Sequence, residues 1–391
     1  METRGRKRKR DMEMRSPFSK LCDDLLVEII SRVPFKSTRC CKCVCRRWCD
    51  VVSHPDHRNK LPRSTLSGFF YKTGNLCCRV MNRHYESLTG NWCPDIDPSF
   101  SFLPKYRLCD VHIDMLDCCN GLLLCRRQQR QPYASDYRTT DYVVCNPTTK
   151  RWVSVPGTIL SSKVLVARLG FDPIVSSHFH VFEFAPAAER VSMQLRVHAR
   201  TKPLGIYSSK AGVWTHPDNW KCPIEIDRYS SSTFFRGLLY LSSCANKVAA
   251  VDMEGNCRVI NIPTSDGSCV ARDVYVSQGQ LYFVISSASE LSIWALEASS
   301  TENWTLKHNV SRLKLFGDEE SSNYDVIIHP EYNVILILCT RFYSTTRTFT
   351  EIMSYDMDSR ELHSVSDLGH DCKSPYLPYV PLFSHSLADG E

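Results

Sequence analysis

A loosely repeated unit runs through the chain from about residue 66, and it restricts the fold more than any other feature. Each unit contains a glycine turn, an apolar strand, a loop, a second apolar strand and a further strand with Trp or a β-branched residue. Such turns occur at Gly121, Gly237 and Gly279, where glycine permits tight bends that other residues resist. The repeat recurs at roughly 40–50 residues, the length of a four-stranded propeller blade. Because a blade buries its faces only against other blades, we predict a ring of six or seven blades over residues 66–385.

Short β-branched and aromatic runs separated by Gly, Pro, Asn, Asp and Ser support this all-β prediction. The predicted strands are Tyr142–Cys145, Val164–Leu169, Phe179–Phe184, Ser192–Val197, Phe234–Leu241, Val248–Asp252, Arg258–Ile262, Val274–Val276, Gln280–Ile285, Leu291–Leu296, Val326–Ile328, Val334–Cys339, Ile352–Asp356 and Leu362–Val365.

The segment before residue 66 has a helical pattern instead. Its apolar residues share one stripe of a 3.6-residue helix. They are Leu21, Leu25, Leu26, Ile29, Ile30 and Val33. We expect Asp23 to cap this helix, Pro34 to end it, and Ser37 to cap a second helix that runs to about Val52. Roughly 40 residues bury too little surface to stand alone, so the stripe needs a partner.

The segment LCDDLLVEIISRVP, followed by Lys36-Ser37 and KCVCRRW, resembles the F-box over residues 18–60, especially its plant form. The resemblance implies that the helices dock on a Skp-type adaptor, which joins them to a cullin–RING ubiquitin ligase. The implied adaptor-binding residues are Leu21, Leu25, Leu26, Ile29, Ile30, Val33, Pro34, Val44 and Trp48. Cys22 replaces the usual proline, and Thr38 and Arg39 replace two usual leucines. Each lost leucine would weaken docking by about 1–3 kcal/mol if the position is fully buried.

The β-rich part resembles the F-box-associated (kelch-related) domain of plant F-box proteins. The matching motifs are CNGLLLC (119–125), VVCNPTTKRW (143–152), LGFDP (169–173), IYSSKAGVW (206–214), FFRGLLYLSS (234–243), YDVIIHPEYNVILI (324–337) and MSYDMDSREL (353–362). Cys145 stands where the family commonly has Trp. The two resemblances imply a small all-α F-box module followed by a large all-β propeller, between a disordered basic tail (1–17) and a short C-terminal tail (386–391).

Charge is unevenly distributed along the chain. Residues 1–63 carry 17 Lys/Arg and 8 Asp/Glu, a net charge of +9, whereas the whole chain is +6 and the remainder is therefore −3. A compact basic cluster lies near the N-terminus: Arg4, Arg6, Lys7, Arg8, Lys9 and Arg10. It is a candidate nuclear-import signal, with a solvated tail and a phosphate-binding segment as alternatives. The negative remainder argues against nucleic acid as the main ligand of the large domain.

Residues with catalytic or metal-binding chemistry are dispersed. No H-E-x-x-H, G-x-S-x-G or phosphate-cradling motif occurs, and no run of 18 apolar residues predicts a membrane span. Cys40-x-x-Cys43 is a single pair, whereas a structural zinc site usually needs two. A continuous helix would align Cys41, Cys45 and Cys49 as apolar packing residues. His54, His57, Asp95 and Asp97 are expected in solvated turns, and Trp92 or Trp220 could anchor a ligand.

Together with these observations, the two resemblances imply a non-catalytic substrate adaptor of an SCF-type (Skp–cullin–F-box) ubiquitin ligase. We expect no cofactor and no metal, an unknown target protein as second partner, and residence in the nucleus and/or cytoplasm. Three alternatives remain: an F-box/propeller scaffold acting outside the ligase, a propeller enzyme with converging acids or a metal in its central funnel, and a nuclear nucleic-acid-binding protein.

Overall fold

The structure is a computed structural model. The chain divides into two compact units, Met1–Thr65 and Leu66–Glu391. The described residues are 21–33, 41, 44–54, 57, 60, 65–74, 81–88, 96–103, 111–129, 139–158, 161, 164, 166–186, 201–217, 220, 226, 230–243, 247–262, 269–287, 289–297, 303–316, 322–343, 347–383 and 387. Among the helices in these ranges, none is both long and apolar enough to cross a membrane.

The first unit contains two described α-helices, α2 (Asp23–Ser31) and α4 (Arg46–Ser53). The residue that caps α2 is Cys22 rather than the predicted Asp23, and its side chain makes no capping hydrogen bond. Asp23 instead starts the first turn, where a carboxylate favours the positive end of the helix dipole.

The predicted continuous second helix is also wrong. Cys45 is extended (φ −161°, ψ 171°) and is the N-cap of α4, so the helical conformation is interrupted between Cys41 and Cys49. The three aligned cysteines of the prediction therefore do not share one helix. Pro34 and Ser37, on which the predicted helix ends depended, lie outside the described residues.

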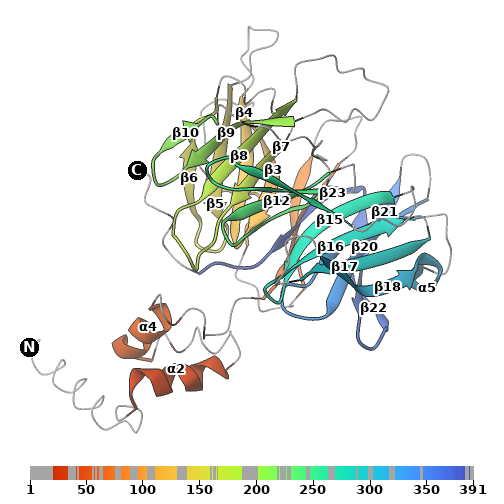
Figure 1. Ribbon diagram of the computed structural model, residues 1–391, viewed down its shortest axis with the longest axis horizontal. Coiled ribbons are helices and arrows are strands. Elements are labelled where there is room, and N and C mark those ends of the chain that lie inside the picture. The colour runs from red at the N-terminus through yellow and green to blue at the C-terminus, as the bar shows by residue number, and fades with distance from the viewer. Residues whose placement is uncertain are drawn as a thin grey trace, which may run out of the picture. The chain divides into compact units, whose positions relative to one another are not determined.

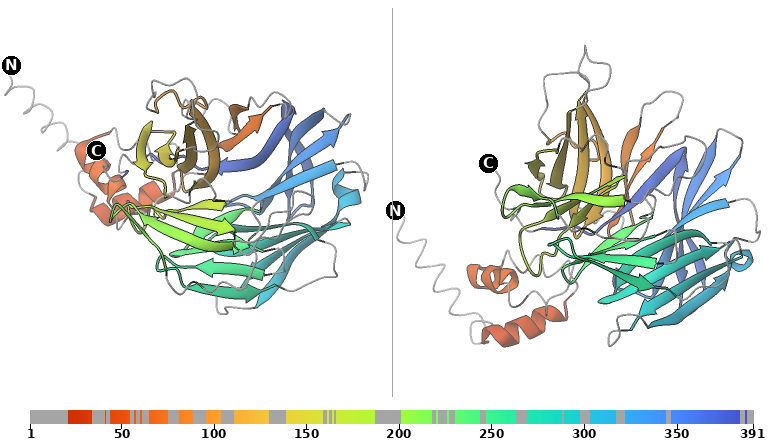
Figure 2. Two further views of the ribbon diagram at one scale, coloured as in Figure 1. Left: turned by 90° about the horizontal axis from the view of Figure 1, so that it is seen from above. Right: turned by 45° about the horizontal axis from the view of Figure 1, so that its top comes forward.

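The second unit is a six-bladed β-propeller (Figures 1 and 2). Five blades are four-stranded antiparallel sheets whose strands are consecutive in the sequence. Blade II contains β3 (Val111–Cys119), β4 (Leu122–Gln129), β5 (Thr139–Asn146) and β6 (Arg151–Val155), and blade III contains β7 (Val166–Gly170), β8 (His180–Pro186), β9 (Thr201–Ser208) and β10 (Val213–Thr215). Blade IV contains β11 (Ser232–Phe235), β12 (Leu238–Ser242), β13 (Lys247–Val251) and β14 (Cys257–Asn261), blade V contains β15 (Cys269–Ser277), β16 (Gln280–Ser287), β17 (Glu290–Leu296) and β18 (Trp304–Ser311), and blade VI contains β19 (Ser322–Ile328), β20 (Val334–Phe342), β21 (Thr348–Asp356) and β22 (Leu362–His370). A short helix, α5 (Arg312–Phe316), follows β18.

Blade I closes the ring from both ends of the unit. Its described strands are β1 (Gly68–Thr73), β2 (Asn82–Ser87) and β23 (Cys372–Tyr379), in the order β2-β1-β23. In Figure 2 the orange strands near the start of the propeller lie beside the last blue strand. The prediction of six or seven blades is therefore resolved at six, because two distant segments share one blade.

The first strands of blades II to VI lie innermost, next to one another, and β23 contacts β3 in the same way. Apolar side chains fill the space between successive blades, as the repeat predicts. Between blades II and III, for example, Leu124 and Val144 pack with Leu169 and Val181. Each sheet thus buries both faces only because neighbours cover them.

Glycine turns recur between the first and second strands, as the sequence predicts. Gly121, Gly237 and Gly279 all have positive φ, and so does the residue before each of them. Two successive left-handed residues form the hairpin turn that matches strand twist. The Gly237 turn divides the predicted strand Phe234–Leu241 into β11 and β12. The predicted strand Ser192–Val197 lies outside the described residues.

Candidate functional sites

The helical unit has its own apolar interior. Leu26, Val27 and Ile30 of α2 pack with Val51 and Val52 of α4 and are at most 8% exposed. Cys41 and Trp48 pack against this cluster from its edge. Leu26 and Ile30 were predicted as adaptor-contact residues, but they have no exposed surface, because α4 covers their side of α2. Their burial against α4 stabilises the helical unit.

Other residues of the predicted stripe remain uncovered. Leu25 is 53% exposed and Ile29 is 42% exposed, and Val44 near α4 is 63% exposed. Residues four apart are neighbours on a helix surface, so Leu25 and Ile29 form one patch, here called the apolar face of α2. Leu21 and Val33 are half-buried, and Pro34 lies outside the described residues.

A polar clamp joins the start of α2 to α4. Arg47 donates to Asp23 Oδ1 from Nη2 (2.7 Å) and from Nε (2.9 Å), and also to the carbonyl of Leu21. Both side chains of the ion pair are more than one-third exposed, so the pair contributes about 0–1 kcal/mol. Its main effect is geometric, because it fixes the end of the helix that carries the apolar face.

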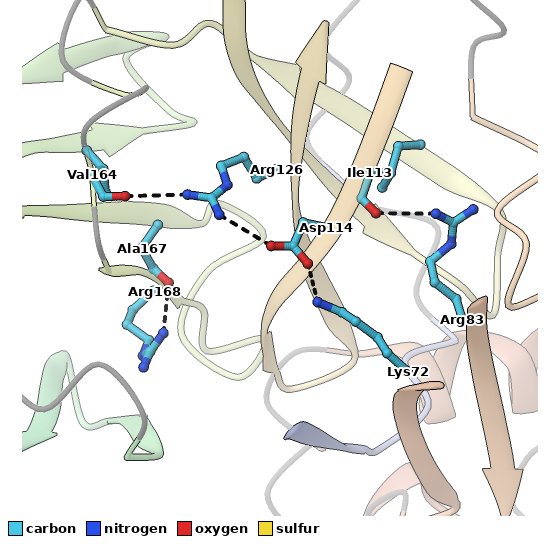
Figure 3. Close-up of polar contacts among 8 residues, drawn as sticks. All are labelled: Lys72, Arg83, Ile113, Asp114, Arg126, Val164, Ala167 and Arg168. Atoms are coloured by element: carbon cyan, nitrogen blue, oxygen red, sulfur yellow. Dashed lines mark hydrogen bonds and ion pairs between the residues drawn. The ribbon is translucent and has the colours of Figure 1, made fainter. Parts of the chain in front are cut away.

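Charged side chains gather on and around the inner strands of the propeller (Figure 3). Asp114 on β3 lies between Lys72 of β1 and Arg126 of β4, and it pairs with both. Arg126 also donates to the carbonyl of Val164 at 3.4 Å, and Arg83 of β2 donates to the carbonyl of Ile113 at 3.2 Å. These contacts join blade I to blade II, and blade II to the segment that leads into blade III.

A second carboxylate on β3 continues this connection. Asp117 accepts hydrogen bonds from the amides of Leu169 on β7 (2.7 Å) and Cys118 (2.9 Å). Burial raises the pKa of Asp117 to about 6, and the positive charge of Arg168 partly opposes that shift. Arg168 in turn donates to the carbonyl of Ser230, just before blade IV (3.1 Å).

Two further inner-strand carboxylates have equivalent roles. Asp273 on β15 accepts from the amide of Ser231 (2.6 Å), which joins blades IV and V. Asp325 on β19 accepts from the hydroxyl of Ser374 on β23 (3.1 Å), which joins blades VI and I. The surrounding strands enclose Asp325 and raise its pKa. The inner-strand carboxylates thus bond to donors of neighbouring blades, an arrangement that ties the ring together.

The other candidate residues have local roles. Trp220 is 8% exposed and packs near Phe184, so it belongs to the core rather than to a ligand site. Asp97 accepts from the amides of Ser99 and Ser101 within its turn, and hydrogen bonds from these serines hold its pKa well below the usual range.

Several predictions fall on residues that the structure does not describe: Trp92, Asp95 and the basic cluster Arg4, Arg6, Lys7, Arg8, Lys9 and Arg10. Within the described ranges, no group of three or more His, Cys, Asp or Glu residues is placed to hold a metal ion. The sequence reasoning missed the charged inner-strand residues. Their signal is present, since Asp117, Asp273 and Asp325 interrupt β-runs that are rich in apolar residues.

Comparison with protein families gives two matches. The model described as "F-box protein At3g26010-like, beta-propeller" matches residues 90–363, and the F-box domain model matches residues 18–60. Among curated proteins of Arabidopsis thaliana, F-box protein At5g07610 is 27% identical over 74% of this chain and 70% of its own length. At1g15680, named for an F-box and kelch repeats, is 25% identical over 79% of this chain and 76% of its own length.

Solved structures are more distant. A Trypanosoma rangeli sialidase in complex with sialic acid aligns with a TM-score of 0.36 and 12% identity, over 66% of this chain and 48% of that one. A likeness this low carries no information about activity.

Proposed function

Because the chain belongs to the family of F-box proteins with an At3g26010-like β-propeller, we propose that it is the substrate-recognition subunit of an SCF-type ubiquitin ligase. An F-box generally marks a substrate adaptor that binds a Skp-type protein. In this chain the helical unit would bind that adaptor, and through it a cullin–RING ligase. The propeller would hold a target protein.

The observation that carries this proposal is the division of the α2 stripe. Leu26 and Ile30 already form an interior with α4, whereas Leu25 and Ile29 remain exposed. Burying a large apolar side chain contributes about 1.5–3 kcal/mol. Because Leu25 and Ile29 are each already about half covered, a partner that covers the apolar face of α2 would gain about 1.5–3 kcal/mol from the pair together, about what one hot-spot residue supplies.

Tethering is the proposed mechanism. A target held on the propeller is kept near the charged conjugating enzyme that the complex supplies, so its lysines react at a raised effective concentration. The chain itself needs no catalytic group for this role. The inner-strand carboxylates support a non-catalytic role, because Asp117, Asp273 and Asp325 accept hydrogen bonds from neighbouring blades.

The test is co-purification of the full chain with a Skp-type adaptor. Leu25→Asp combined with Ile29→Asp places two charges on the apolar face of α2 and should reduce recovery of the adaptor at least tenfold. The matched control is Val213→Asp with Val365→Asp, which alters two exposed apolar residues of outer propeller strands (53% and 41% exposed) and should leave recovery unchanged.

Unchanged recovery with the α2 double variant would overturn the proposed interface. Failure to recover the adaptor with the wild-type chain would instead favour the alternative of an F-box/propeller scaffold acting outside the ligase, for which Thr38 and Arg39 in place of two leucines give a sequence reason.

A further inference from the structure

Blade I contains a seam, where strands from the two ends of the propeller unit pair. The chain connects β1 and β2 onward to blade II, whereas β23 is connected to blade VI. The ring is therefore closed by the noncovalent pairing of β1 with β23, and that pairing has a register irregularity between Phe70 and Lys72. In the other blades all four strands follow one another along the chain.

The residues after β23 cross this seam and attach to blade II. They are residues 380–383 and Leu387, here called the C-terminal strap. The side chain of Asn146 at the end of β5 is fully buried and donates to the carbonyl of Leu382 at 2.9 Å. The hydroxyl of Tyr379, just before the strap, lies 2.7 Å from the Thr148 hydroxyl in the next turn.

The turn between β3 and β4 holds the strap from a second side. Gly121 leaves no room for a side chain, because a Cβ atom there would lie 2.4 Å from Leu382 Cβ and 2.7 Å from the Val380 carbonyl oxygen. Leu387 is only 5% exposed and belongs to the apolar cluster between blades II and III, with Leu382 at its edge. The strap is thus held by a hydrogen bond, a close backbone approach and an apolar anchor.

We propose that the C-terminal strap is a latch that keeps the propeller ring closed. It links the end of β23 to blade II, which carries β1 and β2 by direct chain connection. Opening the seam therefore requires both the β1–β23 pairing and the strap contacts to break. While one set of contacts is intact, it holds the partners of the other set close together, so the broken contacts re-form at a raised effective concentration. The amide and hydroxyl of Ser67, next to β1, also donate to the carbonyl of Tyr379 (2.9 and 3.2 Å), where the strap begins.

Two glycine variants of the full chain separate the latch from ordinary turn strain. Gly121→Ala and Gly279→Ala both place an alanine at positive φ (+87° and +72°) in a β-hairpin turn. Only the first collides with the strap, because nothing lies within 4 Å of a Cβ at Gly279. Hydrogen exchange measured by mass spectrometry should be at least tenfold faster in β1 and β23 for Gly121→Ala than for Gly279→Ala. Blade IV, which contains neither substituted glycine, should exchange alike in the two variants.

A second pair of variants keeps the test decisive if Gly121→Ala does not fold. Leu387→Asp should speed exchange in β1 and β23 in the same way, and Leu387→Met should restore the wild-type rate. Adding Leu387→Asp to Gly121→Ala should give little further increase, since both release the same strap. Equal exchange at the seam for the two glycine variants, or for Leu387→Asp and wild type, would overturn the latch.

Discussion

Asp117 shows how a single buried carboxyl can join two blades at the cost of a pH dependence. It is 9% exposed, accepts two backbone amides and lies near Arg168. Hydrogen bonds and the nearby cation favour the charged form, but burial outweighs them and raises the pKa to about 6. The folded protein therefore binds a proton more tightly at Asp117 than the unfolded chain does.

This shift predicts the direction of a pH effect. Between the unfolded pKa of about 4 and the folded value, the folded state binds more protons, so the free energy of unfolding decreases as pH rises, by roughly 3 kcal/mol in total. Asp117→Asn should remove this contribution to the pH dependence of the free energy of unfolding. Urea unfolding of the propeller from pH 4.5 to 7 measures it.

Asp97→Asn is the control. The pKa of Asp97 is lowered rather than raised, so its contribution to the free energy of unfolding has the opposite pH dependence and is lost only as pH falls. An identical slope for wild type and Asp117→Asn would contradict the role assigned to Asp117.

At the scale of the element, α2 has two apolar sides, one buried against α4 and one exposed. Leu26→Ala should destabilise the helical unit by about 2–5 kcal/mol, because it opens a cavity in a filled interior. Ile29→Ala removes a side chain that is 42% exposed and should cost well under half as much. Hydrogen exchange in α2 of the full chain compares the two variants. Similar acceleration by both would show that α4 does not distinguish the two sides.

The stripe of α2 was predictable from its spacing, but its division was not. Leu25, Leu26, Ile29 and Ile30 are equivalent in a periodicity argument, and only the position of α4 decides which are covered. The break before α4 was missed for a similar reason, since Cys45 has no side-chain feature that prohibits a helix.

Strand predictions were most accurate where apolar runs lie between turns, as in β17 and β20. Two errors have local causes. The run Phe234–Leu241 is apolar on both sides of Arg236-Gly237, so the turn there was read as part of one strand. β23 was missed because Pro375 and Pro378 interrupt it, and proline weakens a strand prediction.

At the scale of the whole molecule, the repeat predicted a ring but not its number of blades. Periodicity reports units whose strands are consecutive. Blade I joins β1 and β2 to β23 from the far end of the chain, and no local pattern contains that pairing. The hydrogen bonds of the inner-strand carboxylates likewise depend on contacts between neighbouring blades, which no local sequence pattern contains.

The basic cluster near the N-terminus matters at the scale of the whole chain, because a nuclear-import signal would set where the chain resides. We propose that Arg4, Arg6, Lys7, Arg8, Lys9 and Arg10 act as a nuclear-import signal. Replacing all six with alanine should shift a fluorescent fusion of the full chain from nucleus to cytoplasm, as imaged in living cells. The Leu25→Asp and Ile29→Asp double variant should keep the original distribution. An unaltered distribution after replacement of the cluster would refute the signal.

The two-ended construction of blade I also sets the order of events during synthesis. β1 and β2 are the first propeller strands to leave the ribosome, but β23, the inner partner of β1, is the last. Until then β1 presents an unpaired edge, which can capture a foreign strand. The ring can therefore close only after β23 has been synthesised, and a messenger RNA that stops before β23 yields a product in which the β1–β23 pairing cannot form.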